Sequence, residues 1–379
     1  MRFLRVVAAA ALVLAIGCSK KESSEILIGH VASLTGSEAT FGQSTDNGIK
    51  LAFEELNKAG GVKGKKLVLK TLDDQGKPEE AQVAATRLIV NDKVTLIIGE
   101  VASSRSLAMG PVAEKNKVPM ISTASTNPKV TLDQQGNTLK YVFRVCFIDP
   151  FQGTVMAKFA RENMKISKVA VLRDVGNAYS VGLADFFEDT FKKMGGEIVT
   201  DQSFKAGDQD FKAQLTKIRE TNPEAIYVPA YYTDVGLISR QVRELGMKVP
   251  LMGGDGWDSE ELYKISQGAL NGSFFSNHYT TESPDERVKS FIEKYKAAYG
   301  SVPDALAALG YDAALVAADA MNRAKDLSGP AIADALAATK DFKAVTGNIT
   351  LNEQHNAVKS AVVIAIDNNA GKYAATVSP

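Results

Sequence analysis

Two turns rich in hydroxyl side chains are the first segments of this 379-residue chain that could do chemistry. An apolar run ending at Gly99 leads into residues 100–104, and a second run ending at Ser122 leads into residues 123–128. The first turn carries Ser and the second carries Ser and Thr at expected helix starts, where hydroxyls and free backbone N–H groups can hold a carboxylate. Ser and Thr are also preferred helix N-caps, so each turn alone fits simple capping equally well.

An acidic turn further along the chain offers the complementary chemistry. The apolar residues 251–253 lead into Gly254-Asp255-Gly256, and an earlier run ends in Tyr231. Small glycines leave one carboxylate free to face a crevice, where it would suit an ammonium group. Hydroxyl donors on one wall and an acid on the other describe an α-amino acid. Gly-Asp-Gly is also ordinary turn chemistry, and a salt bridge of Asp255 within its own half of the molecule would contradict this expectation.

Short β-rich runs alternate regularly with amphipathic segments, which predicts an α/β fold with a parallel, doubly wound sheet. In such a sheet ligands bind beyond the carboxyl ends of the strands, where all three turns fall. The expected strands of a first module are residues 26–31, 66–72, 94–99 and 118–123, and its helices are 46–59, a segment opened by Pro78, and 103–116.

A second module repeats the pattern without detectable sequence repetition. Three helical segments after it suggest that the chain crosses back to complete the first domain, through short connections that act as a hinge. The length suits two α/β domains. The expected strands are 168–174, 197–204, 225–231 and 250–253, the helices 179–194, 211–221 and 235–245, the returning helices 285–299, 304–324 and 330–339, and the last strands 347–351 and 360–367.

The N-terminal sequence has the features of an export signal. Arg2 and Arg5 precede 11 apolar residues at 6–16, which is too short to span a bilayer and right for a signal peptide. The run ends in Gly17-Cys18, which resembles a bacterial lipobox, although Ala15 stands where leucine is commoner. We therefore expect a signal peptide at 1–17, lipidation of Cys18 and a tether at 18–25. Ordinary signal-peptidase cleavage with an incidental Cys18 is the alternative.

Several classes of function lack support in the composition. Lys+Arg and Asp+Glu both number 44, so a basic nucleic-acid surface is not expected. The three histidines are scattered without ligand spacing, so we expect no metal. Cys146 lies in an apolar run and is expected to be a buried small hydrophobe. Adjacent Asp73 and Asp74 are not expected to catalyse, and no catalytic or cofactor motif is recognised, so we expect neither an enzyme nor a cofactor.

A long motif between residues 48 and 81 resembles the N-terminal signature of a known family. The sequence resembles type I periplasmic binding proteins, specifically the leucine/isoleucine/valine-binding (branched-chain amino acid) family of ABC importers, over about residues 26–375. The resemblance implies two Rossmann-like lobes joined by three hinge crossings, with lobe 1 at 26–146 plus 279–360 and lobe 2 at 147–278 plus 361–379. The matching residues are Gly48, Leu51, Ala52, Glu54, Asn57, Gly60, Gly61, Val62, Gly64, Leu67, Asp73, Asp74, Pro78, Glu79 and Ala81.

Ligand contacts follow from the resemblance position by position. It assigns Ser103, Ala124 and Thr126 to the α-carboxylate and α-amino group, Tyr231 to an aromatic lid, and Asp255 to the ammonium. The family often has glutamate at this last position, so aspartate keeps the charge and shortens the reach.

Three further residues complete the predicted site. Phe41 and Tyr179 match aromatic positions near the side-chain pocket. Ala102 is included beside the ligand serine, and it stands with Gln75-Gly76 where some members of the family place a disulfide.

The resemblance implies an extracytoplasmic, lipid-anchored, monomeric binding protein that captures a small amino-acid-like ligand by hinge closure. It would deliver this ligand to the permease and ATPase subunits of an ABC transporter. Relatives that bind amides, urea or aromatic carboxylates remain an alternative, as does a sensor that acts with a separate receptor. The export signal disfavours a transcriptional repressor.

Overall fold

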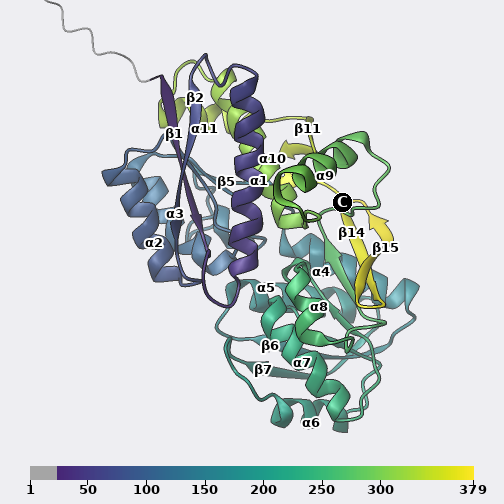
Figure 1. Cartoon of the computed structure of the whole chain (residues 1–379). Helices are drawn as coiled ribbons and strands as arrows, with labels where there is room; N and C mark the ends of the chain where they lie inside the picture. Colours follow the sequence, from purple (N-terminus) through teal and green to yellow (C-terminus); the bar gives the residue numbers. More distant parts are fainter. Residues whose placement is uncertain (1–23) are drawn as a thin grey trace, which may run out of the picture.

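The computed structural model of the protein describes residues 24–379, so the predicted signal peptide at 1–17 and the lipidation site Cys18 lie outside the described residues. Two large sheets and one small sheet organise this part of the chain, and Figure 1 shows them in two lobes, one above the other. Within residues 24–379, no helix combines the length and the apolar character needed to cross a membrane.

The first lobe is built on a five-stranded sheet in the order β2-β1-β3-β4-β5, with all neighbours parallel. The order reverses between β1 and β3, and parallel sheets open a ligand crevice beyond the strand ends at such a point. Residues 100–104 and 123–128 closely follow β3 and β4 and therefore lie at this crevice. The strands are β1 (Glu25–Ala32), β2 (Lys66–Asp73), β3 (Leu96–Ile98), β4 (Met120–Ser122) and β5 (Val142–Arg144).

Helices cover both faces of this sheet. Alternate side chains of β3 enter different apolar clusters: Leu96 and Ile98 join one with α1, and Ile97 joins the other with α2 and α3. Helices α1 and α10 pack against each other, as do α2 and α3 (Figure 1). Their bounds are α1 (Ala39–Lys58), α2 (Pro78–Thr86), α3 (Ser103–Asn116) and α10 (Ala305–Arg323), and the short helical turns η1 (Arg87–Asn91) and η2 (Pro128–Thr131) follow α2 and β4.

The second lobe is built on a seven-stranded sheet in the order β15-β14-β10-β9-β8-β6-β7. Its five parallel strands repeat the winding of the first sheet, and β14 and β15 add an antiparallel edge. The strands are β6 (Lys168–Asp174), β7 (Glu197–Phe204), β8 (Ala225–Tyr227), β9 (Leu251–Gly253), β10 (Phe274–Asn277), β14 (Ala361–Asp367) and β15 (Ala370–Val377).

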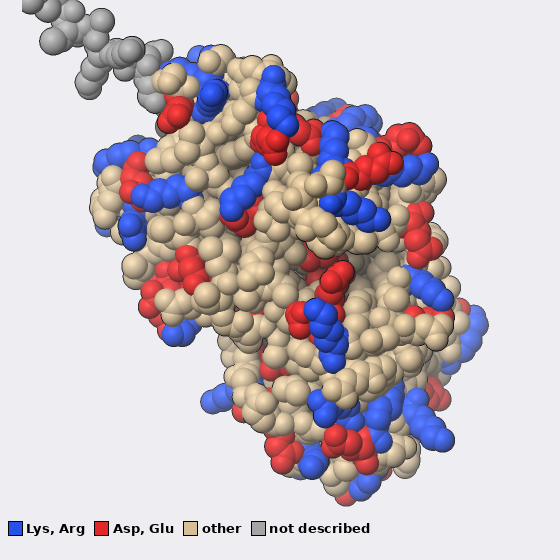
Figure 2. All heavy atoms as spheres, in the orientation of Figure 1, with Lys and Arg blue, Asp and Glu red and all other residues tan. Residues whose placement is uncertain are grey.

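The helices of the second lobe form two groups, since α4 packs against α5, and α7 packs against both α6 and α8. Figure 2 shows basic and acidic side chains interspersed over the visible face of both lobes. The helices are α4 (Asp149–Lys158), α5 (Ala178–Lys193), α6 (Lys212–Glu220), α7 (Tyr232–Glu244) and α8 (Glu260–Ser266), with the short turns η3 (Phe159–Asn163) and η4 (Asp255–Trp257).

The chain passes between the lobes three times, between β5 and α4, between β10 and α9, and between β13 and β14. After the second passage α9 packs on α1, and α11 on α10, so the chain returns to the first lobe as expected. The predicted residue boundaries of the lobes stay a prediction. The remaining elements are α9 (Glu286–Tyr299), α11 (Gly329–Ala337) and the antiparallel strands β11 (Phe342–Ala344), β12 (Gly347–Leu351) and β13 (Ala357–Val358).

Most predicted elements are present, and the differences have local causes. The first helix starts at Ala39 instead of residue 46, because its opening turns carry few apolar residues to reveal it. Strand β8 ends at Tyr227, short of the predicted residue 231, and Pro229 could not donate to a sheet ladder. The mostly exposed β15 lacks an apolar run and was not predicted, and neither were α4 and α8.

Candidate ligand-binding site

A small, tightly closed cavity lies between the two lobes at the carboxyl ends of their strands. Six of the eight residues predicted to contact a ligand line it, and Ala102 and Thr126 do not. The lining consists of Phe41, Val101, Ser103, Ala124, Tyr179, Tyr231, Asp255, Gly256 and Leu306.

Much of the cavity lining is aromatic or aliphatic. The rings of Tyr179 and Tyr231 are stacked with their centroids 5.3 Å apart, and Phe41 meets Tyr231 edge-on at 5.6 Å. Val101 and Leu306 add aliphatic side chains from the first lobe. This lining suits an apolar ligand group held between the lobes.

The hydroxyl-rich turns form the wall of the first lobe, and their own hydrogen bonds fix its shape. Ser103 begins α3, and its Oγ accepts a hydrogen bond from the backbone N–H of Asn127 at 3.2 Å. Ser122 Oγ donates to the Glu100 carbonyl at 2.7 Å, and Ser125 Oγ donates to the Val101 carbonyl at 3.0 Å. The two turns are therefore one rigid unit at the start of α3, where free N–H groups favour an anion.

Ala102 and Thr126 lie just behind this wall. Ala102 is the N-cap of α3 and is buried. Thr126 is fully buried, and within residues 24–379 its Oγ1 has no hydrogen-bond partner. A buried hydroxyl without a partner is unusual and marks a position where a polar ligand group or water could bind.

Asp255 faces the first-lobe wall from the second lobe and is 6% exposed. Its Oδ1 accepts a hydrogen bond from Gln152 Nε2 at 2.8 Å, and its Oδ2 lies 2.9 Å from His278 Nε2. Both neighbours keep the carboxylate in a fixed orientation at the cavity.

Gly254 and Gly256, which flank Asp255, leave no room for a side chain. A Cβ at residue 254 would lie 2.5 Å from the Tyr179 hydroxyl oxygen, and one at residue 256 would lie 2.9 Å from the Ala230 carbonyl oxygen.

Asp255 and His278 contact each other within the second lobe. If the His278 imidazole were protonated, this contact would be the salt bridge that contradicts the prediction, so the charge of the imidazole decides the question. Burial lowers the pKa of His278, with Asp255 opposing the shift. A neutral imidazole donates a hydrogen bond without cancelling the carboxylate charge. The neutral form thus leaves Asp255 able to pair with a cation in the cavity.

A second buried acid, which the sequence reasoning missed, lies close by. Asp149 begins α4 and is fully buried, and its backbone N–H donates to the Thr126 carbonyl at 2.9 Å. Within the described chain no well-aligned hydrogen bond reaches either of its carboxyl oxygens. Burial raises its pKa to about 8, the Thr126 hydroxyl and the charge of Arg144 oppose this rise, and the charge of Asp255 adds to it.

The Asp73-Asp74 pair serves the fold of the first lobe. Asp73 Oδ1 accepts from the backbone N–H of Leu34 at 2.9 Å, and Asp74 Oδ1 accepts from Ser33 Oγ at 2.7 Å. These contacts tie the loop after β1 to the end of β2.

Direct hydrogen bonds close the lobes around the cavity. Thr40 Oγ1 lies 2.9 Å from Ser259 Oγ, and Asn127 Nδ2 donates to the Ala178 carbonyl at 2.7 Å. The two walls therefore meet on opposite sides of the lining residues. Among residues 24–379, no group of three or more His, Cys, Asp or Glu residues is arranged to hold a metal ion.

Residues 25–372 match the family described as Periplasmic binding protein. The chain belongs to this family. The match extends from the start of β1 into β15, so both lobes of this periplasmic binding protein are covered.

Known proteins similar to this periplasmic binding protein carry names for the same class of ligand. The Leu/Ile/Val-binding protein homolog 3 of Brucella melitensis is 35% identical over 92% of this chain and 93% of its own. The leucine-binding protein LivK of Thermotoga maritima is 43% identical with a TM-score of 0.89, covering 93% of this chain and 99% of its own. The branched-chain amino acid transporter protein LivJ of Streptococcus pneumoniae, solved with isoleucine, is 34% identical with a TM-score of 0.88, covering 94% and 100%.

The sequence reasoning missed several residues of this periplasmic binding protein. Val101 and Gly256 stand next to predicted contacts and could have been found by including neighbours. Leu306 gives no local signal, because only the packing of α10 on α1 brings it to the cavity. Gln152 and His278 touch Asp255 but not the cavity, so no turn motif points to them.

Proposed function

We propose that this protein is the periplasmic solute-binding component of an ABC importer and binds a branched-chain or other apolar α-amino acid. The observation that carries the proposal is the cavity between the lobes, which combines a largely apolar lining with Ser103 on one wall and Asp255 on the other. An apolar zwitterion presents the complementary groups. The relatives named for leucine, isoleucine and valine support the same class of ligand.

Binding proceeds by hinge closure in this proposal. The carboxylate docks on the start of α3, with Ser103, Ala124 and Thr126 as its contacts, while the lobes are apart. The second lobe then brings Asp255 to the ammonium group and Tyr231 over the ligand. Closure excludes water, so the Asp255–ammonium attraction acts where it is weakly screened.

A ligand series tests this proposal. Calorimetry with the purified protein, refolded to remove any bound ligand, should give tight binding of leucine, isoleucine or valine. The leucine analogue 4-methylpentanoate lacks the ammonium group and should bind at least one hundred times more weakly. Tighter binding of benzoate, urea or a short amide than of any amino acid would overturn the assignment.

The cellular setting is proposed from the N-terminal sequence and the family. Cleavage before Cys18 and its lipidation would anchor the protein to the membrane, from which it would serve the permease and ATPase subunits as a monomer. We assign it no catalytic activity and no cofactor. The substitution Cys18→Ser should move the protein from the membrane fraction to the soluble extracytoplasmic fraction, and an unchanged membrane fraction would contradict the anchor.

A further inference from the structure

His278 joins the proposed ligand acid to the hinge. It follows β10 directly, at the second passage between the lobes, and its side chain is completely buried. Its Nε2 lies 2.9 Å from Asp255 Oδ2, and its ring stacks on Phe147 with centroids 3.8 Å apart. Phe147 belongs to the first passage, so the imidazole, itself part of the second passage, contacts one other hinge connection and the cavity carboxylate at once.

The hydrogen-bond geometry indicates which proton His278 carries. Asp255 already accepts from Gln152 and offers an oxygen to the imidazole, so Nε2 is assigned as the donor. Within residues 24–379, Nδ1 is buried and has no hydrogen-bond partner. A second proton at Nδ1 would be a buried donor without an acceptor, which is unfavourable. The packing therefore selects the neutral imidazole.

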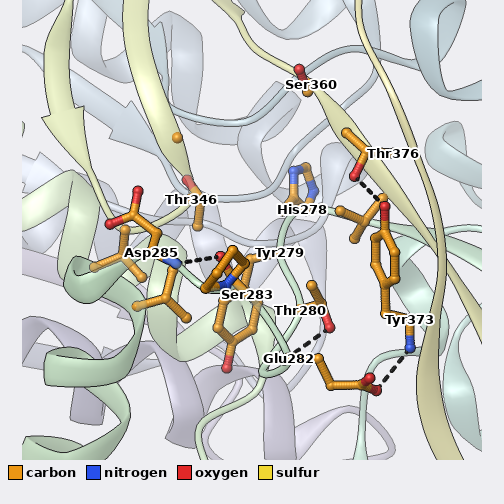
Figure 3. A pocket seen from close by; sticks show the side chains of 15 residues that line it. His278, Tyr279, Thr280, Glu282, Ser283, Asp285, Thr346, Ser360, Tyr373 and Thr376 are labelled. Atoms are coloured by element: carbon orange, nitrogen blue, oxygen red, sulfur yellow. Dashed lines mark hydrogen bonds between the residues drawn. The ribbon is translucent and has the colours of Figure 1, made fainter.

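A hollow on the hinge side of the molecule approaches the same residue. Its volume is about 330 Å³, and His278, Thr346 and Ser360 are among the residues that line it (Figure 3). Figure 3 also shows Glu282 and Asp285 around the hollow. His278 thus lies between the ligand cavity and a second, open surface of the protein.

We propose that His278 is a positioning residue, whose neutral imidazole donates to the Asp255 carboxylate and keeps it directed at the ligand ammonium. This inference rests on the amino-acid-binding function proposed above. A proton taken up at Nδ1 turns the imidazole into a cation, which competes with the ligand ammonium for the same carboxylate. Ligand affinity then depends on the charge of a residue that does not touch the ligand.

The charges around His278 agree with this role. Burial lowers its pKa, Asp255 opposes the lowering, and the ammonium of Lys359 adds to it. Glu282 and Asp285 line the hollow on the outer side. An ammonium group bound at Asp255 would disfavour the imidazolium further, so ligand and proton exclude each other.

Two substitutions separate the hydrogen bond from the stacking. His278→Phe keeps a ring against Phe147 but removes the donor, and His278→Gln keeps an N–H donor but removes the ring. Leucine binding measured by calorimetry should weaken about tenfold in His278→Phe and stay within about threefold of wild type in His278→Gln. The reverse order would show that stacking matters instead, and would overturn the proposal.

A double-mutant cycle tests whether His278 acts through Asp255. In the Asp255→Ala background, His278→Phe should change the leucine Kd by less than twofold. A tenfold loss in that background would overturn the proposal. Failure of wild type to bind any amino acid would instead overturn the proposed function, so the two failures are distinguishable.

The pH profile supplies a readout that a purely structural role would not move. Wild-type affinity for leucine should fall as the pH is lowered from 7 to 5, and the profile of His278→Gln should be flatter. His355→Gln is the matched control, because His355 also stacks on a phenylalanine, Phe143, at 4.1 Å, but within residues 24–379 its ring bonds to the Val142 carbonyl and not to Asp255. Parallel profiles for wild type and His278→Gln would overturn the proposal.

Discussion

Asp255 and Asp149 are both buried at the junction of the lobes, yet their surroundings differ. Asp255 accepts from Gln152 and lies against His278, and it reaches the cavity. No well-aligned hydrogen bond reaches either carboxyl oxygen of Asp149 within residues 24–379, and burial raises its pKa to about 8 although the nearby Thr126 hydroxyl opposes the rise. Donors stabilise the charged form of an acid, and burial without donors favours the neutral form.

The difference assigns separate roles to two acids of the same type. Asp255 has a hydrogen-bonding side chain at each carboxyl oxygen, which suits a carboxylate that attracts an ammonium group. Asp149 is best accommodated as a neutral acid between Thr126 and the second lobe. Burial alone therefore does not identify a ligand-binding carboxylate, and the donors around it carry more information.

The largest expected effect is the loss of the charge at residue 255. Asp255→Asn should weaken leucine binding by about 2–5 kcal/mol, because the ligand ammonium is left buried without its partner. Calorimetry measures the change. Binding within about twofold of wild type would remove Asp255 from the site and leave Asp149 as the candidate anion.

The matched substitution at residue 149 should stabilise the protein. The folded-state pKa of about 8 lies above the ordinary 3.8, so this acid's contribution to stability is complete below about pH 4 and is lost as the pH rises towards 8. Asp149→Asn should therefore raise the free energy of unfolding at pH 8 by about 1–3 kcal/mol.

Thermal unfolding with saturating leucine, compared at pH 5 and pH 8, measures this effect in the closed form. The gain should be larger at pH 8, and leucine affinity at pH 7 should stay within about threefold of wild type. A larger gain at pH 5, or a loss of affinity like that of Asp255→Asn, would contradict the neutral role of Asp149.

Removing a donor should make Asp255 resemble Asp149. Gln152→Leu keeps a similar volume but deletes the Nε2 donor, so leucine binding should weaken by about 1 kcal/mol. The Kd from calorimetry tests this. Leu183→Met, a buried change on α5 that removes no donor, is the control, and an equal loss there would point to general disturbance of the packing.

The smallest effect is expected at Tyr227, whose buried hydroxyl has no hydrogen-bond partner among residues 24–379. Tyr227→Phe should leave stability unchanged or raise it by up to about 1 kcal/mol. Tyr179→Phe should instead lower it, because the Tyr179 hydroxyl accepts from the Gly256 N–H at 3.1 Å. Unfolding curves of both variants measure the contrast, and a larger loss at Tyr227 would reveal a partner for that hydroxyl.

Much of the fold could be predicted from the sequence because strong local patterns mark its elements. The strand β7 at Glu197–Phe204 and the helix α3 at Ser103–Asn116 have the predicted bounds. Helix α4 was missed, since it begins Asp149-Pro150 and is buried on several sides, which hides any amphipathic stripe.

The residues of the candidate site also fall into those that local sequence patterns indicate and those that they do not. Residues in turns after strands, such as Ser103 and Asp255, could be found because the topology of parallel sheets places such turns together. Leu306, Gln152 and His278 lie on other elements and meet the site through tertiary packing alone. Sequence patterns reflect contacts between residues that are close in the chain. The contacts of these three residues with the site are made by residues far away in the chain, so no local pattern indicates them.

The cavity residue Leu306 lies in the first turn of α10, and the N–H of the preceding Ala305 donates to Asp258 Oδ2 at 2.7 Å. Asp258 follows Asp255 by three residues in the second lobe. The first turn of α10 therefore both lines the cavity and carries a contact that joins the two lobes. A ligand that shifted Leu306 would disturb that contact as well.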